Sequence, residues 1–155
     1  SLLRLPEASS PLADLAGGSF ASVLDDPAMA GRDPSEVRYV IMCSGKIYFD
    51  MALAPERAAR TDLALVRCER LYPFPSDELA AVLARYPNIE KVAWVQEEPR
   101  NMGARKFVLP KIRHLVPFRI PLGDISRPER SRPAEGYPAT HAAEQARIVR
   151  DALAG

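Results

Sequence analysis

Short apolar runs alternate with segments of helical periodicity from Val37 onward. Three of these runs are apolar at every position, so that both faces of each segment are hydrophobic: Tyr39–Cys43, Leu63–Val66 and Val92–Val95. Runs of this length with two apolar faces are typical of central strands in a parallel sheet. The pattern therefore predicts three adjacent, buried, parallel strands.

The segments between and after these runs predict helices. One helix face is marked by apolar residues at spacings of three and four, namely Leu79, Val82, Leu83 and Tyr86. Ser76 is expected to be the N-cap of this helix. A preceding helix is expected over residues 46–60, kinked or shortened by Pro55. Two later helices are expected, over residues 104–116 and from a cap at Thr140.

This strand–helix–strand–helix–strand order predicts an α/β fold of three layers, with a mostly parallel sheet and helices on both faces. A fourth strand is expected at Phe118–Ile120. The first 30 residues differ, because three prolines, a Gly-Gly pair and scattered leucines give no periodicity. We expect residues 1–30 to form an amino-terminal arm or linker and residues 31–155 to form the α/β domain.

Composition fits one ordinary globular domain. The 155 residues are 47% hydrophobic and 26% charged, and 21 basic against 20 acidic residues leave a net charge of +1. This balance lacks the basic excess of a nucleic-acid-binding protein, and no apolar run reaches the roughly 18 residues of a membrane-spanning helix. Cys43 and Cys68 lie in apolar runs, which favours reduced, buried thiols over a disulfide. We expect neither nucleic acid nor a membrane as partner.

Candidate binding residues follow the predicted strands, where open α/β sheets bind ligands. The turn Ser44-Gly45-Lys46 follows the first strand and opens a helix, so its backbone donors and its lysine favour an anion. The alternative is a tight turn with a surface lysine. Arg127, Arg130 and Arg132 crowd a proline-rich stretch and suit a phosphate or a carboxylate. The alternative there is a solvated loop whose arginines pair with glutamates.

Two neighbouring carboxylates, Glu97 and Glu98, end the third strand. Paired carboxylates suit acid–base chemistry or cation binding, and the alternative is a turn in which one glutamate pairs with an arginine. The two histidines, His114 and His141, are not adjacent to a cysteine in the sequence. A cysteine nucleophile or a zinc site therefore has little support. The residues alone predict a fold and no reaction.

Five segments together are far more specific than any one of them. They are SLLR at 1–4, CSGKIYFD at 43–50, VRCERLYPFP at 66–75, WVQEEPRNMGA at 94–104 and RPERSRPAEGYPATHAAEQ at 127–145. In order and spacing they resemble the carboxyl-terminal domain of the thiamine-diphosphate-dependent first component of 2-oxoglutarate dehydrogenase. The resemblance covers nearly the whole chain. One departure is Arg105, where the family pattern usually has a tryptophan.

The resemblance implies a fold like the carboxyl-terminal domain of transketolase, in a much longer enzyme whose two larger, preceding domains hold thiamine diphosphate and Mg²⁺. That enzyme converts 2-oxoglutarate to CO2 and a succinyl group on the lipoyl domain of a dihydrolipoyl succinyltransferase, in the citric acid cycle. The family's cofactor motif, Gly-Asp-Gly followed by an asparagine, is absent here. We therefore expect no catalytic, cofactor-binding or metal-binding residue in this fragment, which alone should be inactive.

In the family this domain completes a homodimer and, in some relatives, offers a surface for a nucleotide or acyl-CoA effector. The candidates for such an effector site are the residues singled out above for anion binding: Ser44, Lys46, Arg127, Arg130 and Arg132. The expected location of the enzyme is the cytoplasm, as in bacteria, rather than the mitochondrial matrix. The alternative is a free-standing α/β module that binds an anion or a nucleotide without catalysis.

Overall fold

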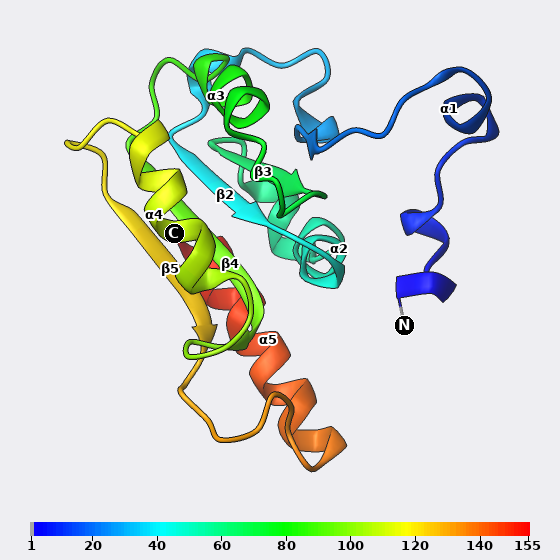
Figure 1. Ribbon diagram of the computed structural model, residues 1–155, viewed down its shortest axis with the longest axis vertical. Coiled ribbons are helices and arrows are strands. Elements are labelled where there is room, and N and C mark those ends of the chain that lie inside the picture. Colours follow the sequence, from blue (N-terminus) through cyan, green and yellow to red (C-terminus); the bar gives the residue numbers. More distant parts are fainter. Residues whose placement is uncertain (1) are drawn as a thin grey trace.

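A five-stranded sheet forms the middle layer of the computed structural model, which describes residues 2–155 (Figure 1). Its strands are β1 (Val23–Leu24), β2 (Tyr39–Cys43), β3 (Leu63–Cys68), β4 (Lys91–Pro99) and β5 (Leu122–Arg127). The spatial order is β1-β3-β2-β4-β5, and every neighbouring pair is parallel except β1 with β3. The predicted mostly parallel α/β sheet is confirmed.

Helices cover both faces of the sheet. The α-helices are α1 (Leu12–Gly17), α2 (Lys46–Ala52), α3 (Ser76–Ala84), α4 (Arg105–Leu115) and α5 (Pro138–Ala154). The 3-10 turns are η1 (Leu2–Arg4), η2 (Pro6–Ala8), η3 (Pro27–Met29), η4 (Pro34–Glu36) and η5 (Pro55–Ala59). Helices α2 and α5 pack on one face with their own apolar cluster, and α3 and α4 pack on the other. The predicted three layers are confirmed.

The central strand β2 contributes to both hydrophobic layers. All five of its residues are buried. Val40 and Met42 belong to the layer under α3 and α4, whereas Ile41 and Cys43 belong to the layer under α2 and α5. Because successive side chains point to opposite faces, a strand covered on both sides is apolar throughout. This is why uninterrupted apolar runs predicted the central strands correctly.

Two predicted elements are wrong in extent or in place. The helix expected over residues 46–60 is two segments, α2 and η5, because Pro55 opens the second and cannot donate a backbone hydrogen bond to the first. The fourth strand is β5, not Phe118–Ile120. The backbone N–H of Ile120 donates to the carbonyl of Pro117 in a turn, and the Phe118 side chain is 93% exposed.

Two predicted helix caps are also wrong. Helix α3 begins at Ser76 itself, with Pro75 in the N-cap position, and Thr140 lies inside α5, which begins at Pro138. Proline suits the first turn of a helix because the backbone N–H there has no partner within the helix. The helix expected over residues 104–116 is confirmed as α4.

Strand β1 is an edge strand that the sequence pattern did not predict. It pairs antiparallel with β3, and a buried ion pair holds the segment that follows it. Oδ2 of Asp26 accepts from Nη2 of Arg57 at 2.6 Å and from the backbone N–H of Leu65 at 2.9 Å. Arg57 also donates to the backbone carbonyls of Leu63 and Arg60. No helix within residues 2–155 combines the length and the apolar composition that crossing a membrane requires.

Candidate functional site

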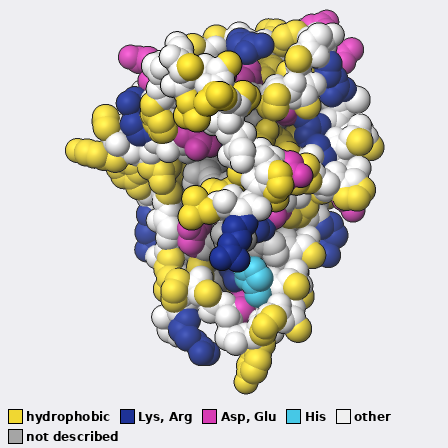
Figure 2. Space-filling model, turned by 90° about the vertical axis from the view of Figure 1, so that its right-hand side faces the viewer, with side chains coloured by type: hydrophobic (Ala, Val, Ile, Leu, Met, Phe, Trp, Pro, Cys, Tyr) yellow, Lys and Arg dark blue, Asp and Glu magenta, His cyan; other side chains and the backbone are white. Residues whose placement is uncertain are grey.

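The parallel strands end at one edge of the sheet, where charged side chains from several elements meet. This carboxyl edge includes Lys46 at the start of α2, Glu97 on β4, Arg127 at the end of β5 and two residues of α5, His141 and Gln145. In Figure 2 a histidine lies beside basic and acidic side chains on the face shown. Ligands of open α/β sheets bind at such an edge.

Gln145 connects three elements at this edge. Its Nε2 donates to Oδ2 of Asp50 on α2 and to Oε1 of Glu97 on β4, both at 2.7 Å. Its Oε1 accepts from Nη2 of Arg127 at 3.2 Å. One neutral amide therefore separates two carboxylates from a buried guanidinium and hydrogen-bonds to all three.

Lys46 belongs to the same network. Its Nζ lies 2.5 Å from both carboxylate oxygens of Asp50, one turn further along α2. The lysine side chain is half-exposed, so its ammonium group can reach solvent. The preceding Gly45 has a φ of 74°, a left-handed conformation that favours glycine. The predicted Ser44-Gly45-Lys46 turn thus carries the lysine directly from β2 into α2.

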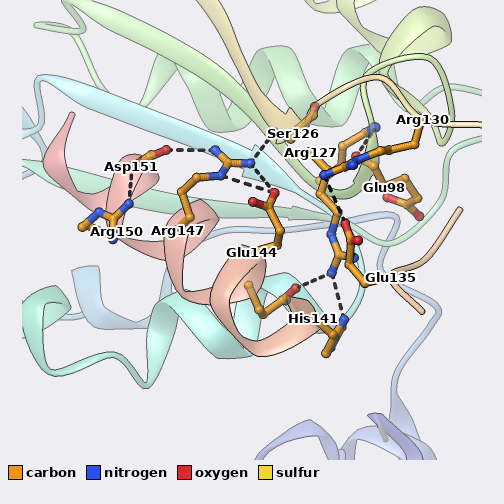
Figure 3. Close-up of polar contacts among 12 residues, drawn as sticks. Glu98, Ser126, Arg127, Arg130, Glu135, His141, Glu144, Arg147, Arg150 and Asp151 are labelled. Atoms are coloured by element: carbon orange, nitrogen blue, oxygen red, sulfur yellow. Dashed lines mark hydrogen bonds and ion pairs between the residues drawn. The ribbon is translucent and has the colours of Figure 1, made fainter. Parts of the chain in front are cut away.

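Arg127 is the buried part of the cluster, with only 3% of its surface exposed. Its Nη2 lies 3.0 Å from Nδ1 of His141, and its Nη1 lies 3.9 Å from Oε1 of Glu135 (Figure 3). Its Nε has no hydrogen-bond partner among the described residues. A buried guanidinium whose nearest carboxylate lies 3.9 Å away, beyond hydrogen-bonding distance, has its positive charge only partly compensated. Arg127 therefore favours negative charge at this edge.

Arg130 lies at the exposed end of the cluster. Its side chain shares Glu135 with Arg127, at 3.8 Å. Its backbone is fixed by Asn101, which accepts from the Arg130 N–H at 3.2 Å and donates to its carbonyl at 2.8 Å. Lys46, Arg127 and Arg130 are thus linked through shared carboxylate and amide groups.

Two of the five predicted residues lie apart from this cluster. Arg132 is exposed and makes no ion pair or hydrogen bond with the residues that the structure describes. Ser44 lines a separate hollow of about 520 Å³, together with Tyr72, Trp94 and Phe107. The alternative interpretation, in which the arginines of the proline-rich stretch pair with glutamates, is correct for two of them. Arg127 and Arg130 both form an ion pair with Glu135, at 3.9 and 3.8 Å.

The Glu97–Glu98 pair is not a metal site in this structure. Glu97 accepts from Gln145 and Glu98 is exposed, so the alternative in which an arginine pairs with one of them is wrong. Within residues 2–155, no group of three His, Cys, Asp or Glu side chains is arranged to hold a metal ion. Both cysteines are free and buried, as predicted. Burial raises the pKa of the Cys43 thiol, and it raises that of Cys68 to about 11.

The loop after β4 is built around the buried side chain of Gln96. Its Oε1 accepts from Nε1 of Trp94 at 3.1 Å and from the backbone N–H of Arg105 at 2.9 Å. Its Nε2 donates to the carbonyls of Met102 and Pro99. Gly103 has a φ of 67°, and a Cβ there would lie 3.0 Å from the Gln96 amide. Gln96 therefore holds together the turn over residues 100–104, which connects β4 to α4.

Arg105, which replaces the family's tryptophan, forms a two-pronged ion pair. Its Nε and Nη2 donate to the two carboxylate oxygens of Asp124 on β5 at 2.7 and 2.8 Å. These hydrogen bonds, assisted by the charges of Arg105 and Arg100, hold the pKa of Asp124 below its usual range. The sequence pattern pointed to neither Asp124 nor Gln145, because the residues that they contact are distant in the chain.

Comparisons with known proteins agree with the resemblance. The family model described as 2-oxoglutarate dehydrogenase C-terminal matches residues 9–153. The chain is 42% identical over 154 residues to a protein named 2-oxoglutarate dehydrogenase E1 component from Geobacillus sp. (strain WCH70). Proteins of the same name from Cupriavidus necator and Azotobacter vinelandii are 42% and 41% identical over 154 and 156 residues.

Each of these alignments covers 99% of this chain but only 16% of the relative. The chain therefore corresponds to a small part of these proteins. The α/β fold described above is the fold of that part and not of the whole relative. Because the family model matches nearly all of this chain, the chain belongs to the 2-oxoglutarate dehydrogenase C-terminal family.

Proposed function

We propose that this chain is the carboxyl-terminal, dimer-completing and regulatory domain of a thiamine-diphosphate-dependent 2-oxoglutarate dehydrogenase first component. Its homologues bear that component's name, and the chain spans 16% of their length. The whole enzyme would decarboxylate 2-oxoglutarate and pass the succinyl group to the lipoyl domain of a dihydrolipoyl succinyltransferase. Thiamine diphosphate and Mg²⁺ would bind outside this chain. Residues 1–30 would lead from the preceding catalytic domain.

The homodimer and the cytoplasmic location belong to the same proposal. The matched relatives are bacterial, which supports a role in the cytoplasmic citric acid cycle. Exposed aromatic side chains, Tyr72 and Phe107, flank the hollow beside Ser44 and would suit a subunit contact. Aromatic residues are enriched at such contacts because they bury a large area at a small entropic cost.

The observation that carries the regulatory role is the network from Lys46 through Asp50 and Gln145 to Arg127. An anion bound by Lys46 and Arg130 would compete with Asp50 and Glu135 for these cations. Asp50 and Glu135 would then lose charge-assisted hydrogen bonds or ion pairs and move. Gln145, which holds α2, β4 and β5 together, would transmit that change to the packing of α5.

The test is to titrate AMP and acetyl-coenzyme A into the full-length enzyme while following 2-oxoglutarate consumption. The site variant is Lys46→Ala combined with Arg130→Ala. The matched control is Lys106→Ala combined with Arg119→Ala, which removes one exposed lysine and one exposed arginine outside the cluster. Since a hydrogen bond to a charged group contributes about 1.5–3 kcal/mol, losing one should weaken the response at least roughly tenfold.

The control variant should respond to the effector as the unmodified enzyme does. Equal responses from the site variant and the control, or no response from the unmodified enzyme, would contradict an effector site at this edge. A response lost only in the site variant supports it.

A further inference from the structure

Residues 10–21, here called the hook, project from the folded structure and are tied to it at both ends. Before the hook, Leu5 and Ala8 pack against the hydrophobic layer of α2 and α5. After it, the backbone carbonyl of Ser22 accepts from the N–H groups of Glu69 and Arg70. Between these anchors no residue is buried, and α1 stands apart from the sheet (Figure 1).

The hook carries apolar side chains that the rest of the described chain leaves uncovered. Leu12, Leu15 and Phe20 are 80%, 74% and 72% exposed. Leu12 and Leu15 are three residues apart and therefore lie on the same side of α1. Asp14 is the one ionisable residue in the hook. Figure 2, which views the molecule from the side where α1 lies, shows many hydrophobic side chains on this face.

Helix α1 is too short to be stable without a packing partner. It has six residues and no buried side chain, whereas isolated helices shorter than about 12–15 residues are marginal in water. At the carboxyl end of the helix, the Gly18 N–H donates to the carbonyl of Asp14. A helix here, with two leucines on one side, indicates an apolar surface that holds it.

We propose that the hook docks onto an apolar surface of the polypeptide that precedes it in the same enzyme chain. The inference rests on the proposed function, in which this domain follows larger domains. The matched relatives are long enough to supply such a surface. This chain covers only 16% of their length, and the family model that matches it is described as C-terminal.

The size of the apolar surface favours a covalently connected partner over a separate molecule. Phe20 presents about 150 Å² and the two leucines about 100 Å² each, which is on the order of 350 Å² together. A stable contact between separate proteins buries about 800 Å² on each partner. A surface of half that area suffices when the two parts are linked, because the linkage raises their effective concentration.

Docking of the hook would also fix the orientation of the carboxyl edge. The hook's first anchor, Leu5, lines a hollow of about 320 Å³ with Gly45 and Phe49, next to the start of α2. Its second anchor, Ser22, is hydrogen-bonded to the end of β3. Both anchors are therefore close to carboxyl ends of strands, so the docked hook would hold this edge against the preceding domain.

The test is amide hydrogen exchange on the full-length polypeptide. Exchange of the amides that α1 hydrogen-bonds, those of residues 16–18, should be at least about a hundredfold slower than in an unstructured peptide, a factor that corresponds to burying two leucine side chains. Leu12→Ser combined with Leu15→Ser should abolish this protection. Leu53→Ser, at an exposed leucine just after α2, is the control and should leave it unchanged. Unprotected hook amides in the unmodified polypeptide would overturn the proposal.

A photoreactive amino acid at position 15, in a mixture of light and heavy isotope-labelled chains, identifies the partner. Cross-links to preceding residues within chains of one isotope label support the proposal. Cross-links between light and heavy chains, or to residues 22–155, overturn it. Activity toward 2-oxoglutarate is measured on the same sample, so that an inactive polypeptide contradicts the proposed function without deciding where the hook docks.

Discussion

Replacing Asp26 by asparagine should destabilise the domain by about 3–5 kcal/mol, the usual loss when one partner of a buried ion pair is removed. The Asp26 and Arg57 side chains are only 3% and 8% exposed, and their charged atoms lie 2.6 Å apart. With the carboxylate gone, the Arg57 guanidinium remains buried with only backbone carbonyls as acceptors. Asparagine also replaces one acceptor oxygen by an NH₂ group, which faces a backbone N–H or the guanidinium.

The assay is urea unfolding of the 155-residue chain, followed by the fluorescence of Trp94, its one tryptophan. With a dependence of about 1–3 kcal/mol per molar urea, the midpoint should fall by roughly 2 M. Asp33→Asn is the matched control, because the exposed Asp33 accepts from the N–H of Ser35 as Asp26 accepts from that of Ala28. The control should lose far less stability.

A second variant separates the charge from the packing. Asp26→Asn combined with Arg57→Met removes both charges, so it should be more stable than Asp26→Asn alone. A loss for Asp26→Asn as small as that for Asp33→Asn, or a double variant that is less stable than the single one, would refute the reasoning.

Three further predictions concern the core, the Arg105 ion pair and the thiols. Val66→Asp should prevent soluble folding, because an unpaired charge in the sheet core costs several kcal/mol; a soluble, cooperatively melting variant would contradict this. Arg105→Met should lower the unfolding free energy by about 1–2 kcal/mol at pH 7. Since the folded-state pKa of Asp124 is depressed, this difference should persist above about pH 4 and vanish as the pH falls through that lowered pKa; urea unfolding at several pH values measures it. Cys43 and Cys68 should react with a thiol reagent at pH 8 only as fast as the protein unfolds, and immediate reaction of the native protein would contradict their burial.

The sequence predicted the centre of the fold because both faces of the central strands are covered. Tyr39–Cys43 is buried at every position, and its apolar run has the same limits as the strand. The edges were harder to predict, since β1 is two residues long and β5 contains Gly123, Asp124 and Ser126. Such segments become strands through pairing with their neighbours, and a single sequence does not show that pairing.

The candidate site was predictable only where its residues adjoin a strand end. Lys46 comes after a two-residue turn at the end of the predicted first strand, which placed it at the carboxyl edge. Arg127 drew attention only as one of several arginines in a proline-rich stretch, because β5, which it ends, was not predicted. Gln145 was not predictable because its role depends on α5 crossing beneath the ends of β4 and β5 and meeting Asp50, 95 residues earlier in the chain. A glutamine in an amphipathic helix carries no signal of such a contact.

The most direct test of the central claim is a decarboxylation assay on the full-length polypeptide that contains this domain. The assay supplies thiamine diphosphate, Mg²⁺ and an artificial electron acceptor, and it compares 2-oxoglutarate with pyruvate. The account predicts saturable turnover of 2-oxoglutarate in preference to pyruvate, with no turnover and no thiamine diphosphate binding by residues 1–155 alone. No activity on 2-oxoglutarate, a preference for pyruvate, or turnover by the isolated 155-residue chain would contradict it.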